Sequence, residues 1–300
     1  MKLKKHILKI LLVLLLFVLI SSVSAADINT NDTQISSASD NDEILSVEND
    51  VDILGESGFT YSDLRKQINT STGDITLNKG NYTYGPNDGD TIEITTSRVI
   101  DGNGSVIDMA GYSLRAFNVT GSDVTIKNLT IKNANFTGDG GAIYFSKSGT
   151  VENCNFTANN ATRGGSVYFN STGNVTNCNF TNNQVTGSNS WGGAIRMYSG
   201  SVENCNFTGN SATIDGGAVY IESTGNVTNC NFTGNNAIHG GAIYFYGEGN
   251  VENCNFAGNN ATYGSGGAVC FYTEGTVRNC NFTGNTATHS GAIFMGSGSV

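Results

Sequence analysis

Short stretches in which apolar and polar residues alternate recur along the chain from residue 74 onward. They predict strands at 74–77, 91–94, 99–101, 106–108, 114–119 and 124–131, because alternation with a period of two places the apolar side chains on one face of a strand. One segment departs from this pattern. In 58–69, Phe59, Leu64 and Ile68 follow helical spacing behind a Thr60–Asp63 capping pair. We expect a short helix there that covers one end of the strand array.

From residue 151 the alternation is organised into a repeat, V-x-N-C-N-F-x-x-N-x-A-x-x-G-G-A-[IV]-x-[FIM], which occurs six times up to Met295. The cysteines of the repeat are spaced 24 to 27 residues apart and are Cys154, Cys178, Cys205, Cys230, Cys254 and Cys280. A unit this short cannot bury its own apolar face, so the copies must stack on one another.

Side-chain parity within one repeat predicts the cross-section of that stack. The strand after Gly-Gly-Ala carries Arg196 at a position that is aromatic in most other copies, so this position is expected to face outward and its two neighbours inward. The cysteine and the phenylalanine two residues later are expected to face inward, with Asn155 outside. Because Val151 has the opposite parity, a turn at Asn153 must separate two strands. Three strands per turn of about 25 residues predict an all-β, parallel β-helix.

Residues at equivalent repeat positions should form ladders along the stack. The asparagines at the turn are Asn153, Asn177, Asn204, Asn229, Asn253 and Asn279. Each of their amides is expected to hydrogen-bond the next rung and a backbone group of the bend, for roughly 1 kcal/mol net. A second series of asparagines ends the Phe-x-x-Asn turn and is interpreted as architectural too; it consists of Asn159, Asn183, Asn210, Asn235, Asn259 and Asn285.

The cysteine ladder is expected to consist of free, buried thiols. Successive rungs are about 4.8 Å apart, whereas a disulfide needs a Cβ separation near 3.8 Å, and buried cysteine also serves as a small apolar residue. Disulfides between neighbouring rungs, formed by local distortion, are the alternative.

Four segments are predicted. Residues 1–25 are predicted to form a signal peptide, because four lysines precede an apolar core that is followed by small residues at the cleavage site. An uncleaved signal anchor is the alternative. Residues 26–56 are an acidic, flexible spacer. Residues 57–135 hold the N-terminal cap and irregular first rungs, and 136–300 hold the regular rungs, which end mid-rung without a cap. Either the chain is truncated, or its open edge supports edge-to-edge association.

Composition narrows the function classes. The chain has 39 Gly, a single Pro and only 13% charged residues, which excludes long helices and favours frequent turns. Loss of the signal peptide would lower the net charge from −10 to −14, so nucleic acid is not an expected partner. No later segment is apolar enough to span a membrane. Seventeen N-x-S/T sequons predict a glycoprotein if the host glycosylates exported chains.

No catalytic residue, metal site or cofactor is predicted. Glu152, Glu203 and Glu252 precede the turn asparagines but alternate with threonine, which places successive glutamates about 9.6 Å apart on an open face. That separation lies just outside the range of a glycosidase pair. No three acids are expected on adjacent rungs, and His239 and His289 occupy variable loop positions.

The candidate ligand-binding surface is the outward aromatic strip. Its members are Tyr144, Tyr168, Arg196, Tyr220 and Tyr244, together with Trp191 in the one lengthened loop. Aromatic platforms beside a guanidinium suit a glycan or a protein. The alternative is structural: Tyr168, Arg196 and Tyr220 would form a stacked cation–π ladder, with Trp191 packed over its own loop. Cys270 is expected to face outward on the same strip, where it could crosslink chains.

The repeat resembles a known family. F-x-x-N, as in residues 156–159, and G-G-A-[ILV], as in residues 140–143, are similar to the repeats of chlamydial polymorphic outer-membrane proteins. The whole chain, with its V-I-D-G-N-G start at 99–104 and its cysteine-bearing rungs, more closely resembles the adhesin-like surface proteins of gut methanogens. The resemblance implies a right-handed, pectin-lyase-like β-helix at the cell surface. The chain has neither the barrel of the chlamydial proteins nor the wall-binding modules of many methanogen ones.

These observations predict a non-catalytic, secreted or cell-surface adhesin-like protein. Its expected partners are glycans or proteins of host or neighbouring cells. Two alternatives remain: a structural spacer of the envelope without a specific ligand, and a polysaccharide lyase or hydrolase of the pectin-lyase-like fold.

Overall fold

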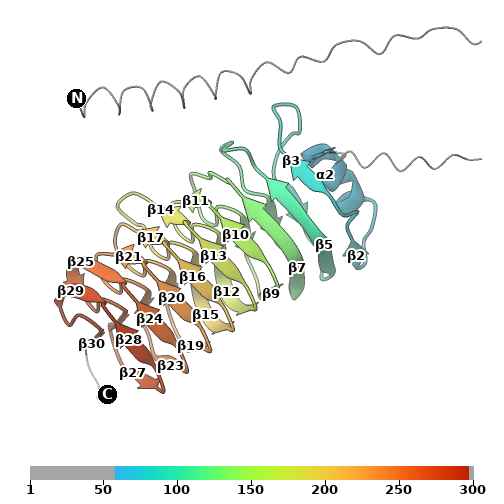
Figure 1. The fold of residues 1–300 in the computed structure, drawn as a ribbon. Helices are drawn as coiled ribbons and strands as arrows, with labels where there is room; N and C mark the ends of the chain where they lie inside the picture. The colour runs from blue at the N-terminus through green and yellow to red at the C-terminus, as the bar shows by residue number, and fades with distance from the viewer. Residues whose placement is uncertain (1–57, 297–300) are drawn as a thin grey trace, which may run out of the picture. The chain divides into compact units, whose positions relative to one another are not determined.

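The computed structural model describes residues 58–296. The predicted signal peptide and spacer lie outside this range. Within it the chain winds into a parallel β-solenoid whose rungs follow one another in sequence order (Figure 1). All strand pairs are parallel, which confirms the predicted β-helix.

The short N-terminal helix is present, and it covers one end of the solenoid (Figure 1). The helix α2 (Tyr61–Asn69) follows β1 (Phe59–Thr60) and begins with the expected capping box between Thr60 and Asp63. Its buried face carries Tyr61 and Leu64, and the Tyr61 hydroxyl donates to the Ala116 carbonyl at 2.6 Å. Arg98 Nη1 donates to the Ile68 carbonyl at 3.1 Å and so satisfies the other end of the helix. The cap is therefore tied to the first rungs by hydrogen bonds at both ends.

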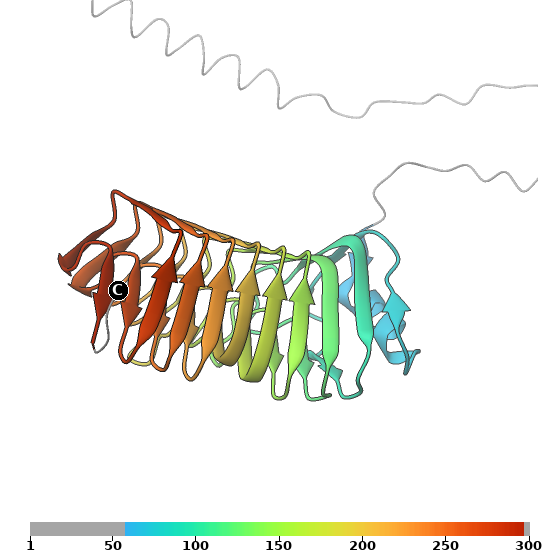
Figure 2. The same ribbon diagram turned by 90° about the horizontal axis from the view of Figure 1, so that it is seen from below.

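Each regular rung contributes strands to four series, and each series runs along the solenoid as a row of parallel strands. Figure 2 shows one such row. The first series, which follows Gly-Gly-Ala in most of the regular repeats, is β4 (Ile92–Ile94), β6 (Phe117–Val119), β8 (Ile143–Phe145), β18 (Val219–Ile221), β22 (Ile243–Phe245), β26 (Val269–Phe271) and β30 (Ile293–Met295). The second is β2 (Ile75–Thr76), β9 (Gly149–Glu152), β19 (Gly225–Thr228), β23 (Gly249–Glu252) and β27 (Gly275–Arg278). Two longer strands, β12 (Val167–Thr176) and β15 (Ile195–Glu203), run through both series.

The third series, after the cysteine, is β3 (Asn81–Thr83), β10 (Asn155–Thr157), β13 (Asn179–Thr181), β16 (Asn206–Thr208), β20 (Asn231–Thr233), β24 (Asn255–Ala257) and β28 (Asn281–Thr283), and β1 pairs with β3. The strands β5 (Val99–Asp108) and β7 (Val124–Lys132) run through the second and third series. A fourth series forms a separate sheet from β11 (Asn160–Ala161), β14 (Gln184–Val185), β17 (Ser211–Ala212), β21 (Asn236–Ala237), β25 (Asn260–Ser265) and β29 (Thr286–His289). The three strands predicted per turn are thus joined by a fourth, short one.

Equivalent residues of successive repeats pair without offset, as Val175 with Val202 and Phe180 with Phe207 illustrate. The core is consequently a set of stacks. Phe156 and its equivalents up to Phe282 stack with centroids 4.7–4.9 Å apart and rings within 7° of parallel. The cysteine and phenylalanine of each repeat face inward, as parity predicted, and Cys154 and Phe156 are fully buried.

The asparagines that end the Phe-x-x-Asn turn form a buried ladder. Asn159, Asn183, Asn210, Asn235 and Asn259 have no exposed surface. In each, Nδ2 donates both to the Oδ1 of the asparagine on the following rung, at 2.9–3.2 Å, and to a backbone carbonyl, at 3.0–3.1 Å. The same Oδ1 also accepts the backbone N–H of the preceding asparagine. Each amide therefore satisfies buried backbone groups that water cannot reach.

The turn series that begins at Asn153 plays a different part from the one predicted. These six asparagines are exposed, and the only side-chain hydrogen bond that the series donates in the described residues is from Asn153 Nδ2 to its neighbour Glu152 at 3.3 Å. The expected bonds to the next rung are absent. All six instead adopt left-handed backbone angles, with φ between 51° and 56°, which asparagine tolerates better than most residues. Their role is to turn the chain between the second and third series.

A third ladder lies on the outside of the third series. Asn179 Nδ2 donates to Asn155 Oδ1 at 2.8 Å, and the pattern continues rung by rung to Asn281. Here each amide donates to the preceding rung, whereas each buried amide donates to the following rung. These exposed asparagines include several of the sequons.

All seven cysteines are free. In the core ladder each backbone N–H donates to the sulfur of the next rung at 3.4 Å, as from Cys178 to Cys205. Burial raises the pKa of the Cys178 thiol well above its ordinary value. The thiols therefore act as small apolar residues that also accept weak hydrogen bonds.

We predict that Asn210→Ala lowers the free energy of unfolding by about 3–5 kcal/mol, because it leaves several buried polar groups without partners at about 1–3 kcal/mol each. These include the Phe180 carbonyl and the Asn183 N–H. The matched control is Asn206→Ala on the same rung, where water can replace the exposed amide and the loss should stay below about 1 kcal/mol. Urea denaturation would measure both. Equal losses for the two variants would contradict a special role of the buried ladder.

We also predict that iodoacetamide labels none of the fully buried cysteines in the native chain, and all seven cysteines after unfolding in denaturant without reductant. The fully buried cysteines are Cys154, Cys178, Cys205, Cys230 and Cys254. Burial prevents the reagent from reaching the sulfur and disfavours the thiolate, which is the reactive form of cysteine. Mass spectrometry of the alkylated chain would count the labels. Fewer than seven labels in the unfolded, unreduced chain would instead demonstrate disulfides.

Candidate functional site

The aromatic strip that parity placed on the outside of the first series is covered rather than exposed. Tyr168, Arg196, Tyr220 and Tyr244 retain only 3%, 5%, 5% and 9% of their surface, and Tyr144 is partly buried. The prediction that these side chains form an open binding surface is therefore wrong. They do face away from the core, but a second layer of chain lies over them.

That second layer, here called the loop layer, consists of the residues that precede the first five glycine pairs: Asp139, Arg163, Trp191, Asp215 and His239. Isolated bridges join Asp139 to Arg163, Trp191 to Asp215 and Asp215 to His239. The glycine that follows each residue folds the loop back over the strand. At Gly192, for example, φ is 69°, and a Cβ would collide with the Ile195 carbonyl. The repeated Gly-Gly thus explains why the strip is covered.

The structure does bring the predicted binding residues together, but as a packed ladder. The Trp191 ring stacks on Tyr220 with centroids 5.5 Å apart, and Tyr220 stacks on Tyr244 at the same separation. The Arg196 guanidinium lies 4.7 Å from the centroid of Tyr168. Their arrangement matches the stacked cation–π alternative in part: Arg196 lies over Tyr168, whereas Tyr220 is stacked by Trp191 and not by Arg196. These contacts stabilise the sheet.

The charged members of this region are mostly paired. Arg163 binds Asp139 through two hydrogen bonds of 2.7 and 2.6 Å, and Arg196 forms an ion pair with Glu222. Cys270, expected to face solvent, is 3% exposed, and burial raises the pKa of its thiol to about 12. Because it is buried, it is not available for crosslinking.

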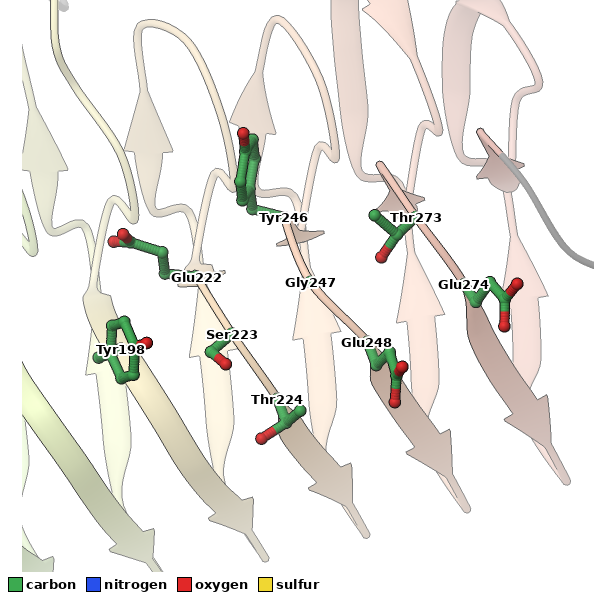
Figure 3. A pocket seen from close by; sticks show the side chains of 9 residues that line it. All are labelled: Tyr198, Glu222, Ser223, Thr224, Tyr246, Gly247, Glu248, Thr273 and Glu274. Carbon is green, nitrogen blue, oxygen red and sulfur yellow. The ribbon is translucent and has the colours of Figure 1, made fainter.

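The more accessible surface lies beside this strip, at the turns that connect the first series to the second. There a shallow hollow of about 760 Å³ spans successive rungs (Figure 3). It is lined by Tyr198, Glu222, Ser223, Thr224, Tyr246, Gly247, Glu248, Thr273 and Glu274. We call this hollow and the adjoining Tyr272 the tyrosine trough.

Tyrosines give the trough its apolar surface. Tyr198, Tyr246 and Tyr272 are 47%, 49% and 57% exposed, and the last two stack with centroids 5.0 Å apart and rings 5° from parallel. Only two other large apolar residues, Tyr112 and Tyr263, are comparably exposed in the described part of the chain. Tyrosine rings gathered in one place on an otherwise Asn-, Thr- and Ser-rich surface are typical of a contact site.

Glutamates give the trough its charge. Glu248 and Glu274 precede Gly249 and Gly275, which pair in register, so the two occupy the same position on adjacent rungs. Glu222 lies on the rung before them. The sequence prediction considered only the residue before each turn asparagine and did not consider this loop. Even so, no group of three or more His, Cys, Asp or Glu in residues 58–296 is close enough to hold a metal ion.

Two further hollows, of about 470 and 440 Å³, continue the trough over the second series. The first shares Thr224 and Glu248 with the trough, and the second shares Asn226 and Asn250 with the first. On this face Glu203, Thr228 and Glu252 follow one another, as the sequence predicted. The result is a continuous polar surface with its aromatic part at one edge.

The trough could not be predicted from the repeat because its residues vary between copies. The position of Tyr246 is Ser146, Asn170 or Glu222 in other copies, so a search for recurring residues passes over it. One sequence pattern could have indicated the trough: two consecutive loops share the pattern Tyr-x-Glu, in Tyr246-Gly247-Glu248 and Tyr272-Thr273-Glu274.

Comparison with known proteins agrees with the architecture. Among the described residues no helix has the length and apolar character needed to cross a membrane. No curated protein matches the sequence. The family model described as a right-handed beta helix region matches residues 68–226, more than half of the chain. The chain therefore belongs to the right-handed β-helix family.

Proposed function

We propose that this chain is a non-catalytic, adhesin-like β-helix that binds glycans of host or neighbouring cells through the tyrosine trough. The observation that carries the proposal is one hollow lined by two exposed tyrosines and three glutamates, with a third exposed tyrosine, Tyr272, stacked on Tyr246 beside it. A sugar ring presents C–H groups on its faces and hydroxyls on its rim. The tyrosine faces suit the former, and the carboxylates accept charge-assisted hydrogen bonds from the latter.

The charge of the trough favours neutral or amine-bearing sugars. Glu222 is paired with Arg196, but Glu248 and Glu274 form no ion pair within residues 58–296. A ligand carboxylate about 5 Å from either would be repelled by about 0.8 kcal/mol in water. That repulsion is modest for one pair, but it is repeated along an acidic polymer and adds to the net charge of −10.

The form of the trough favours a polymer over a single sugar. The three connected hollows lie over several rungs, with polar ladders along their floor, including Asn226 and Asn250 at 2.9 Å. An open surface of this kind buries only part of each ligand residue, so useful affinity requires several contacts together.

Export and surface location form part of the proposal. The predicted signal peptide and the likeness of the repeats to methanogen adhesin-like proteins and chlamydial outer-membrane proteins support them. So do the sequons, several of which lie on the exposed asparagine ladder of the third series. Because neighbouring rungs are about 4.8 Å apart, bulky glycans would fit on only some of these asparagines.

We predict saturable binding of the chain to an array of neutral and amino glycans, and at least tenfold weaker binding after Tyr246→Ala with Tyr272→Ala. Two lost aromatic contacts at about 0.5–1.5 kcal/mol each support a loss of this order. Tyr263→Ala, which removes an exposed tyrosine of β25, is the matched control and should leave binding unchanged. Glu248→Gln with Glu274→Gln should improve binding to acidic glycans relative to neutral ones.

Three outcomes would overturn this proposal. If wild-type chain bound no glycan on the array saturably, a structural spacer would be the better description. If the Tyr263 variant lost as much affinity as the double tyrosine variant, the trough would not be the site. If a bound polysaccharide became shorter during incubation, as size-exclusion chromatography would detect, the protein would be an enzyme.

We predict that protein isolated from its native cells begins at Ala26 and is found in the surface or extracellular fraction. N-terminal sequencing and intact mass would test this, and a mass above that of the processed chain would indicate glycosylation of the sequons. An N-terminus at Met1 in the soluble cell interior would contradict export.

A further inference from the structure

The tyrosine trough extends along the solenoid axis. Its lining residues come from the equivalent loop of four successive rungs, the loops that contain Tyr198, Glu222, Tyr246 and Thr273 (Figure 3). The strands that precede these loops pair in register from rung to rung. Because neighbouring rungs are about 4.8 Å apart, the first and the fourth loop are separated by about 14 Å. The hollow is therefore long in the direction in which the repeat is copied.

Backbone contacts hold these loops at the rung spacing. The Tyr246 N–H donates to the Ile221 carbonyl on the preceding rung at 2.9 Å. A Cβ at Gly247 would lie 2.0 Å from the Ser223 carbonyl oxygen, so the two loops approach one another more closely there than a side chain would allow. A ligand therefore meets groups whose positions are already fixed, which lowers the entropic cost of binding.

Identical residues recur on two adjacent rungs of the trough. Tyr246 stacks on Tyr272 with centroids 5.0 Å apart, and Glu248 and Glu274 occupy equivalent positions two residues later. Around the solenoid, by contrast, the residue type changes at every step of the loop. Only a ligand that extends along the axis presents the same group to the same residue on each rung. One unit of an extended, β-linked hexose polymer is close in length to the rung spacing of about 4.8 Å, so such a chain stays in step with the rungs.

The two unpaired glutamates of the trough differ from other acids of the solenoid. At four places an acid is neutralised by a base on the adjacent rung: Asp101 by Lys127, Asp108 by Lys132, Asp139 by Arg163 and Glu222 by Arg196. In the second series, Thr228 separates Glu203 from Glu252. Glu248 and Glu274 instead follow one another directly, both exposed. Like charges so placed on adjacent strands are destabilising, and a cationic ligand would remove that cost.

We propose that the trough binds a β-linked amino glycan along the solenoid axis, with one sugar unit per rung and two of its ammonium groups paired with Glu248 and Glu274. The proposal rests on the function proposed above and narrows its ligand to amine-bearing polymers. Each ammonium donates charge-assisted hydrogen bonds to a carboxylate, while the tyrosines contact the sugar rings. Two further units extend to the rungs of Glu222 and Tyr198, where Glu222 already has a cationic partner in Arg196.

The charge of the ligand is tested with β-1,4-linked glucosamine oligomers and their N-acetylated counterparts of equal length, whose nitrogen carries no charge. In isothermal titration calorimetry at mildly acidic pH, the free-amine tetramer should bind about tenfold more tightly than the acetylated one, because two charge-assisted pairs are added. Glu248→Gln with Glu274→Gln should abolish this preference. The matched control, Glu93→Gln with Glu152→Gln, removes two acids outside the trough and should keep it.

The direction of the bound chain is tested by oligomer length. Affinity for the free-amine oligomers should rise with each unit up to about four, since four rungs line the trough, and then level off. Tyr198 lies on the rung farthest from Glu274. Tyr198→Ala should therefore weaken binding of the tetramer several-fold more than binding of the dimer, which fills only the rungs of Glu248 and Glu274.

The outcomes separate this inference from the function on which it rests. If free-amine and acetylated oligomers bound equally well and both depended on Tyr246 and Tyr272, the proposed function would stand and the inference would be overturned. An affinity that stops rising at two units would overturn it as well, since a chain that crosses the solenoid contacts few rungs. Tighter binding of a lysine oligomer would indicate a peptide ligand instead. Absence of binding by both sets of glycans would overturn the function and the inference together. Far-UV circular dichroism would verify that the variants are folded.

Discussion

The fold depends on the satisfaction of buried polar groups at the turn that every rung makes after its core phenylalanine. The chain bends there inside the molecule, where backbone N–H and carbonyl groups have no access to water. The buried asparagine closes this bend with hydrogen bonds to its own turn and to the next rung at once. The same side chain therefore stabilises both the bend of its own rung and the contact with the following one, in support of the in-register backbone pairing of the strands.

Strict register has a consequence for where function can reside. Since each residue lies over its equivalent on the next rung, a residue that is repeated produces a uniform stripe along the solenoid. In this chain the uniform stripes stabilise the fold. Distinct chemistry arises only where the repeats differ. The loop after the first series is such a place: its residues change from serine and asparagine in the early rungs to tyrosine and glutamate in the later ones. The trough is thus a local departure from the repeat, on a scaffold that the repeat makes rigid.

Much of the fold could be predicted from the sequence because it rests on period and parity. The inward positions of Cys154 and Phe156, the short capping helix and the architectural Asn159 series are all determined within one rung. Side-chain parity did not predict the burial of Arg196 and Tyr220, because it specifies the face of the strand on which a side chain lies but not which residues cover that face. The covering loop is set by a tertiary feature, the backward fold at Gly192. The hydrogen bonds predicted for the Asn153 amide are absent for a related reason. Asn153 contributes to the turn through its left-handed backbone angle and not through its side chain.

The two asparagine ladders run in opposite directions. Each amide of the buried ladder points its N–H groups toward the following rung, and each amide of the exposed ladder points toward the preceding one. Aligned amide dipoles in a single chain add up along its length, as they do in an α-helix. Here the axial components of these two chains oppose one another, so their dipoles partly cancel. Repeat duplication lengthens both ladders together, and the partial cancellation is kept as the solenoid grows.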